Sequence, residues 1–208
     1  VSIPINLGQK KPGVSLGSKE LYKHYFSNYD NKKFNLVSTD ISQNLFALQK
    51  FIREEVEKNY DMVFYLGGDH SISMGTISGQ FLNFETKKCV IWLDAHTDCN
   101  NIAMSQTGNI HGMPVAGLLG DLEHPFDKFK CLQYDEICYI GTRSIDNYEN
   151  ENIKKNKILN LGREEVHSNL DLVLQKVDKF INGREVHISF DIDIMDPSII
   201  SSTGTPEK

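Results

Sequence analysis

Three short groups of polar residues could bind metal ions. They are Gly67-Gly68-Asp69-His70-Ser71, Asp94-Ala95-His96-Thr97-Asp98 and Asp191-Ile192-Asp193, the last followed by Asp196-Pro197. Carboxylates held close together repel each other unless a cation lies between them. Imidazole and carboxylate ligands suit Mn, Co or Fe, and the groups contain no thiolate ligand that would favour a structural zinc. They therefore predict a site for a divalent cation.

Six side chains in these groups are the candidate ligands: His70, Asp94, His96, Asp98, Asp191 and Asp193. This number exceeds what one tetrahedral ion uses. Two ions about 3.5–4 Å apart that share carboxylates fit it better. Such a pair would lower the pKa of a bridging water, so that hydroxide becomes available near neutral pH.

The spacing within the groups predicts how the side chains meet. In an extended chain, residues i, i+2 and i+4 point to one face, which would bring Asp94, His96 and Asp98 together. Asp191 and Asp193 would share a face in the same way. Other interpretations are a solvated acidic loop for the second group and a helix cap or Asx turn for the third. His70 taken alone is equally well explained as a hydrogen-bonded residue at a helix entry.

Each polar group follows an apolar segment that reads as a strand. The predicted strands are Val1–Ile5, Met62–Leu66, Cys89–Leu93, Ile137–Ile140 and Val186–Phe190, and the predicted helices are Lys19–Phe26 with Ser18 as N-cap, Ser42–Tyr60, Ser71–Phe81 and Arg163–Ile181. Short apolar strands alternating with helices predict an α/β fold of three α/β/α layers, in which helices cover both faces of a mainly parallel sheet. Ligands of such sheets bind at the carboxyl ends of the strands.

Composition excludes several other classes. Asp and Glu outnumber Lys and Arg 28 to 22, so the net charge of −6 disfavours a nucleic-acid partner. No apolar run approaches the roughly 18 residues that a membrane span needs. The four cysteines lack CxxC spacing, so free thiols and a cytoplasmic location are expected. We find no linker within the 208 residues and expect one domain, truncated at both ends because the chain starts without Met and stops in a loop.

The three groups resemble the motifs of the ureohydrolase family, which contains arginase and agmatinase. GGDHS, DAHTD and SFDIDIMDPS stand in the family's order and spacing, and the resemblance extends from the Gly8-Gln9 loop to Thr203-Gly204-Thr205-Pro206. The segments Gly108-Asn109-Ile110-His111-Gly112 and Gly141-Thr142-Arg143-Ser144-Ile145-Asp146 are most similar to the arginase branch. Ser144 departs from it, because many arginases carry Asp there.

The resemblance implies a set of residue roles. His70, Asp94, Asp98 and Asp191 would hold one Mn²⁺, and His96, Asp94, Asp191 and Asp193 the other, with Co²⁺ or Fe²⁺ as alternative metals. His111 would be the proton shuttle. Asn100, Thr107 and Asn109 would face the substrate's α-carboxylate, and Asp146, with Glu149 acting through water, its α-amino group. The family's late carboxylate would lie beyond Lys208.

The reaction implied is hydrolysis of L-arginine to L-ornithine and urea, by attack of metal-bound hydroxide on the guanidinium carbon. By the same resemblance the protein would be a homo-oligomer, a trimer or hexamer. The lack of a long apolar run disfavours a membrane partner. The alternatives are an agmatinase or another guanidino-compound hydrolase, and a catalytically inactive metal-binding member of the family. A phosphoryl-transfer enzyme fits less well, because no cluster of Lys or Arg accompanies the metal motifs.

Overall fold

The computed structural model describes residues 1–81 and 87–207, and these form two compact units. The first, here the N-terminal unit, is built from the described residues of Val1–Leu82 and Asn101–Cys131. The second, here the sheet unit, is built from those of Asn83–Asn100 and Leu132–Lys208. Each unit is described by itself below.

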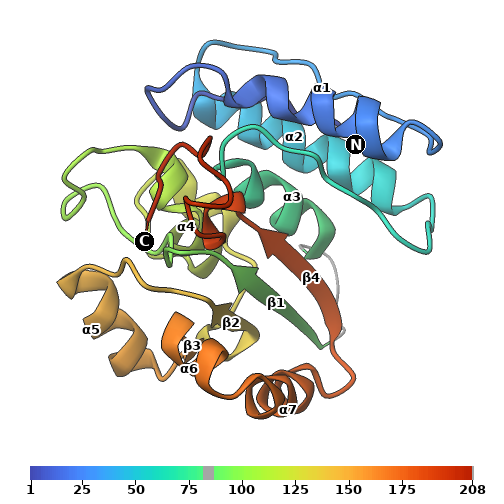
Figure 1. The fold of residues 1–208 in the computed structure, drawn as a ribbon. Helices are drawn as coiled ribbons and strands as arrows, with labels where there is room; N and C mark the ends of the chain where they lie inside the picture. Colours follow the sequence, from blue (N-terminus) through green and yellow to red (C-terminus); the bar gives the residue numbers. More distant parts are fainter. Residues whose placement is uncertain (82–86, 208) are drawn as a thin grey trace. The chain divides into compact units, whose positions relative to one another are not determined.

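A parallel sheet forms the centre of the sheet unit (Figure 1). Its strands are β1 (Lys88–Leu93), β2 (Ile137–Ile140), β3 (Leu159–Leu161) and β4 (Glu185–Phe190), in the order β3-β2-β1-β4. All three pairings are parallel. The central strand β1 is buried along most of its length, which is typical of parallel strands and explains its continuous apolar sequence. The short strand β3 is not among the predicted strands.

Helices α5 (Asn147–Asn156), α6 (Arg163–Ser168) and α7 (Leu170–Ile181) complete this unit, with short 3₁₀ turns at Tyr134–Glu136 and Ile192–Ile194. Apolar side chains of α6 and α7 pack on one face of the sheet, around a buried cluster of Ile91, Cys138, Leu161 and Val173. The prediction of one continuous helix over 163–181 is wrong. Asn169 has φ −156° and ψ 80°, and its side chain accepts a hydrogen bond from the Leu172 amide, which caps α7.

The outer strand β4 is only partly covered. Ile188 and Phe190 are 63% and 60% exposed, so the described residues do not cover this strand on both faces as expected. The burial of β4 alternates along its C-terminal half, with His187 and Ser189 buried. The carboxyl end of β4 lies next to that of β1, because Leu93 pairs with Phe190. This register brings the second and third polar groups to one edge of the sheet.

The N-terminal unit is mainly helical. It contains α1 (Gly17–Leu21), a π-helical turn (Tyr22–Phe26), α2 (Ile41–Val56), α3 (Ile72–Phe81), α4 (Pro114–Leu119) and 3₁₀ turns at Val14–Leu16, Ile110–Gly112 and Phe126–Phe129. Helices α2 and α3 pack closely. Gly75 and Gly79 of α3 permit this, because a β-carbon at either position would collide with α2. None of the helices in the described part of the chain has the length and apolar character needed to cross a bilayer.

Two predicted strands of this unit form only isolated bridges. Ser2 forms isolated β-bridges with Lys33 and with Leu66. In the described residues, Val1–Ile5 and Met62–Leu66 do not pair over more than this single bridge. Met62 is 70% exposed, so the predicted buried strand is wrong there. Ser18 is also not the N-cap of the first helix, since it lies inside α1 and its hydroxyl donates to the Ser15 carbonyl.

Candidate metal centre

Asp94, His96 and Asp193 meet at the carboxyl edge of the sheet. The Nδ1 atom of His96 lies 3.3 Å from Oδ1 of Asp94 and 3.2 Å from Oδ2 of Asp193. Each of the three residues offers one ligand atom, and these atoms lie within 4.8 Å of one another. The geometry thus brings together three of the six predicted ligands within one unit, in an arrangement that could hold a cation.

Main-chain hydrogen bonds build this cluster from two strands. The Asp94 amide donates to the Ile140 carbonyl (3.2 Å), and the Asp191 amide donates to the Leu93 carbonyl (2.9 Å), so both segments continue the pattern of the sheet. The Ala95 amide then donates to Oδ1 of Asp193 (3.2 Å), which ties the two segments together directly.

The two carboxylates are almost fully buried, with Asp94 1% and Asp193 2% exposed. Burial desolvates the His96 imidazole, which lowers its pKa, but hydrogen bonds to Asp193 and Asp94 outweigh this and raise the pKa to about 11. For Asp193, burial raises the pKa, but the contacts with His96 and Thr205 outweigh it and hold the pKa below its ordinary value. The raised pKa of His96 reports a strongly negative potential from the carboxylates around it, whereas the lowered pKa of Asp193 reports the hydrogen-bond donors that face its carboxylate. Such a potential, with nitrogen and oxygen donors, fits a divalent cation.

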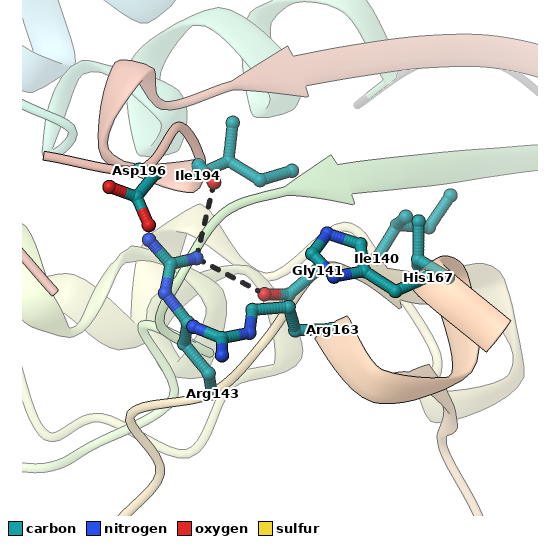
Figure 2. A pocket seen from close by; sticks show the side chains of 8 residues that line it. Ile140, Gly141, Arg143, Arg163, His167, Ile194 and Asp196 are labelled. Atoms are coloured by element: carbon teal, nitrogen blue, oxygen red, sulfur yellow. Dashed lines mark hydrogen bonds between the residues drawn. The ribbon is translucent and has the colours of Figure 1, made fainter. Parts of the chain in front are cut away.

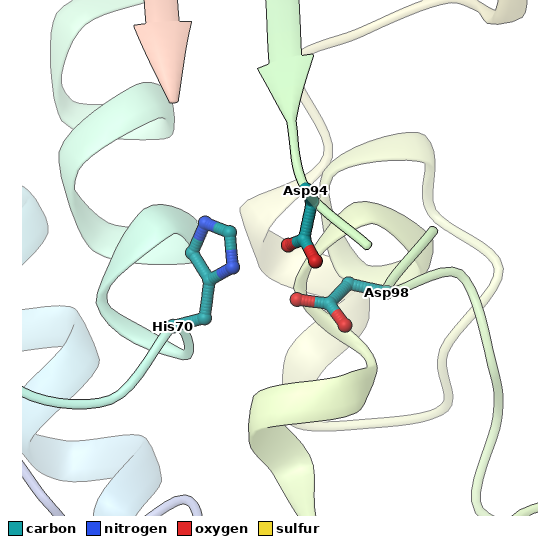
Figure 3. Close-up of side chains that lie close together, drawn as sticks. All are labelled: His70, Asp94 and Asp98. Atoms are coloured by element: carbon teal, nitrogen blue, oxygen red, sulfur yellow. The ribbon is translucent and has the colours of Figure 1, made fainter. Parts of the chain in front are cut away.

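Asp98 lies next to this cluster. Figure 3 shows Asp94 at the end of β1 and Asp98 just beyond it, and their carboxylate oxygens lie within 4.8 Å of each other. Asp98 has φ +48°, so the extended-chain argument for its position is wrong; the chain reaches the same result through a turn. A left-handed conformation is uncommon at residues other than glycine, and Asp is among those that adopt it most readily.

The two aspartates of the third polar group, Asp191 and Asp193, make different contacts. Asp193 joins the cluster, whereas the Asp191 carboxylate accepts a hydrogen bond from the Asp193 amide (3.0 Å) and caps the turn Ile192–Ile194. Among the described residues, Asp191 is not part of a three-ligand group. Asp196 makes the Asx turn considered for it, because its Oδ1 accepts from the Ser198 amide (2.8 Å).

The loop that precedes Lys208 also reaches the cluster. The Thr205 hydroxyl donates to Oδ2 of Asp193 (2.6 Å), and Oε1 of Glu207 lies 3.7 Å from Nε2 of His96. Neither residue is among those predicted for the site. No local pattern marks them, because the contacts arise only when the loop folds back toward β1.

Three of the predicted substrate-binding residues lie together in the sheet unit. Asn100 donates to Oδ2 of Asp146 (2.5 Å), and Oδ1 of Asp146 accepts from the Glu149 amide (2.9 Å) as the N-cap of α5. Glu149 completes this capping box through the Asp146 amide (3.1 Å). Glu149 is buried, and burial raises its pKa. Cys99 follows Asp98 directly in the sequence. Its side chain is buried and accepts a hydrogen bond from Asn152, which fits a residue that packs in the interior.

The other predicted site residues, His70, Thr107, Asn109 and His111, belong to the N-terminal unit. His70 lies just before α3, in a loop fixed by Asp69, whose carboxylate accepts from the amides of Gly8 (2.8 Å) and Ser71 (3.0 Å). The amide of His111 donates to the Gly8 carbonyl (3.1 Å). The Gly8 segment therefore contacts both the His70 loop and the His111 turn.

Comparison with known proteins defines the class. The arginase family model matches residues 1–208, so the chain belongs to the arginase family of ureohydrolase enzymes. Over 99% of its length the chain is 37% identical to Arginase-1 of Bos taurus, of which it covers 74%, and 33% identical to the arginase of Entamoeba histolytica, of which it covers 78%. The match to Arginase-1 of Mus musculus covers half of that protein.

Solved structures agree with this assignment. The Entamoeba histolytica arginase in complex with L-ornithine has a TM-score of 0.91 at 32% identity, over 99% of this chain and 78% of that one. The Bacillus subtilis arginase has a TM-score of 0.88 at 27% identity, over 99% and 77%. The predicted α/β arginase-like fold with a parallel central sheet is thereby confirmed.

Proposed function

We propose that the protein is a dinuclear manganese hydrolase that converts L-arginine to L-ornithine and urea. The observation that carries this proposal is the cluster of Asp94, His96 and Asp193 at the carboxyl edge of the sheet. Membership in the arginase family supports the substrate and the reaction. The L-ornithine bound to the Entamoeba histolytica arginase supports the same product class for this chain.

The proposed ligands are the six predicted from the sequence. His70, Asp94, Asp98 and Asp191 would hold one ion, His96, Asp94, Asp191 and Asp193 the other, so that Asp94 and Asp191 serve both. Oxygen and imidazole ligands suit Mn²⁺ and also Co²⁺ or Fe²⁺. When bound, the two ions lower the pKa of a water and stabilise negative charge that develops on the attacking oxygen.

His111 would supply the proton that the reaction needs. A guanidinium carbon is a poor electrophile, and the bond to the departing nitrogen breaks only if that nitrogen leaves as a neutral amine. We assign His111 to protonate this nitrogen, which becomes the side-chain amine of ornithine, directly or through a water.

The ends of the substrate would be held by polar side chains. Asn100, Thr107 and Asn109 offer neutral donors suited to the α-carboxylate, and Asp146 offers a negative charge suited to the α-ammonium. The Asn100–Asp146 hydrogen bond supports this assignment, because it keeps a donor and an anion side by side. Glu149 would act on the α-ammonium through water, or through Asp146, whose amide it binds.

We expect the protein to prefer L-arginine to agmatine by at least about 10³-fold in kcat/KM. Agmatine lacks both α-groups, so it would leave polar groups of the site unpaired, and such a mismatch is costly. The measurement is urea release from both compounds. Equal or faster turnover of agmatine would contradict the arginine assignment and leave the hydrolase chemistry in place.

A single substitution tests the same point within the site. Asp146→Asn keeps the cap of α5, because Asn caps helices as well as Asp does, but it removes the charge. Losing a hydrogen bond to a charged group costs about 1.5–3 kcal/mol, so KM for L-arginine should rise about 10–100-fold. The KM for agmatine should stay unchanged, and Asp171→Asn, at an exposed position of helix α7, is the matched control.

The resemblance also supports one ureohydrolase domain across residues 1–208 and a trimeric or hexameric homo-oligomer. None of the four cysteines, all within the described residues, forms a disulfide bond, and three of them are buried. This supports a reducing compartment such as the cytoplasm.

A further inference from the structure

Arg143 connects the two ligand-bearing segments of the sheet unit. Its amide donates to the carbonyl of Ala95 (2.9 Å), the residue between Asp94 and His96. Its guanidinium reaches the other segment, where Nη2 donates to the carbonyl of Asp193 (2.7 Å). One residue thus fixes the main chain beside ligands of both strands.

The guanidinium of Arg143 is surrounded by carbonyl oxygens. Figure 2 shows it between Gly141 and the turn after β4, with hydrogen bonds from Nη1 to the carbonyls of Ile194 (3.2 Å) and Gly141 (3.4 Å). Nη2 also donates to the carbonyl of Glu207 (2.9 Å), in the loop that carries Thr205. This loop contacts Asp193 through Thr205 and His96 through Glu207.

These acceptors require the shape of an arginine. They belong to three segments of the chain, and a planar group with several fixed donors can bind all three at once. A lysine ammonium carries the same charge but is a compact group with three donors, so it could not reach all these carbonyls from one position. The contacts are made to main-chain oxygens, so they position the ligands without touching a bound ion.

We propose that Arg143 is a positioning residue for the metal centre, holding Asp193 and the 205–207 loop in place for the ion bound by His96. This inference rests on the proposed dinuclear site. Groups that orient metal ligands typically contribute 10–100-fold to metal affinity. Arg143→Met and Arg143→Lys should therefore both weaken binding of one Mn²⁺ by about 10–100-fold and leave the other ion bound as in the wild type.

Arg163 provides the matched control. It lines the same cavity of about 210 Å³, together with Arg143 and His167, and its own amide donates to the carbonyl of Thr142. Arg163→Met removes an equal charge from the same cavity, so it should leave both Mn²⁺ affinities unchanged within about twofold, as is usual for changes away from ligand-orienting contacts.

The experiment is a Mn²⁺ titration of the full chain followed by electron paramagnetic resonance, with thermal unfolding of each variant by circular dichroism. Selective loss of one ion in both Arg143 variants, with cooperative unfolding retained, supports the proposal. Unchanged affinities in these variants, an equal loss in Arg163→Met, or loss of both ions together with cooperative unfolding would overturn it. A wild type that binds fewer than two ions would contradict the proposed dinuclear site, which is a separate outcome.

Discussion

Replacing His111 by Asn is expected to lower kcat by about 10²–10⁴-fold, the usual contribution of a general acid or base, with both metal ions still bound. Asparagine is polar and cannot transfer a proton at neutral pH, so the departing amine would lose its acid. The amide of His111 donates to the Gly8 carbonyl, and this contact is preserved because it uses the main chain. Steady-state kinetics and metal analysis of the same preparation measure both quantities.

His124→Asn is the matched control for this prediction. His124 is exposed in the same unit, with 69% of its side chain accessible, and it has no proposed role. The kcat of the His124→Asn variant should equal that of the wild type. Loss of metal from His111→Asn would show that His111 is a ligand, and an unchanged kcat would show that the proton comes from another group.

The second large effect is expected at Asp94. Its carboxylate accepts from the His96 amide (2.8 Å) and the Trp92 indole (3.1 Å), and it is proposed to serve both ions. Asp94→Asn replaces one of the two side-chain oxygens by an NH2 group, which cannot bind a metal ion, and it removes a buried negative charge. Because a bound metal contributes several kcal/mol of transition-state stabilisation, urea release should fall by about 10³-fold or more.

Asp193→Asn should have a smaller effect than Asp94→Asn, because Asp193 is proposed to bind one ion only. The two variants change the same chemical group in buried surroundings, so their ratio separates the bridging role from simple loss of charge. Asp171→Asn, at an exposed position of helix α7, controls for the loss of one negative charge. An equal loss of urea release in Asp94→Asn and Asp193→Asn would contradict the bridging role of Asp94. Metal analysis of each variant would then show how many ions it has lost.

The sequence predicted those parts of the fold that depend on local pattern. The apolar run Cys89–Leu93 predicts β1 because both of its faces are buried, and the periodicity of Ser42–Tyr60 predicts α2, which ends four residues earlier, at Val56. The segment Leu159–Leu161 was missed because three residues carry no recognisable period. Met62–Leu66 was overpredicted, because an apolar run becomes a strand only if a partner pairs along its whole length.

For the candidate site, the closeness of three predicted side chains is confirmed, and their role as metal ligands stays a prediction. Asp94, His96 and Asp193 were chosen from their places after apolar strands, and the parallel register of β1 and β4 brings them together. The contacts of Arg143 and Thr205 with Asp193 could not be inferred, since they depend on a main-chain carbonyl and on a loop that folds back to the sheet. Such contacts follow from the tertiary fold and leave no spacing in the sequence.

The most direct test of the account is to measure urea release from L-arginine together with the Mn²⁺ content of the protein. The full-length protein is first stripped by a chelator and then titrated with Mn²⁺, with bound metal measured by atomic absorption at each point. Activity should be absent without metal, should follow binding of the second ion and should reach its maximum at two ions per chain. Full activity with no more than one ion per chain, or no urea from a chain that holds two, would contradict the account.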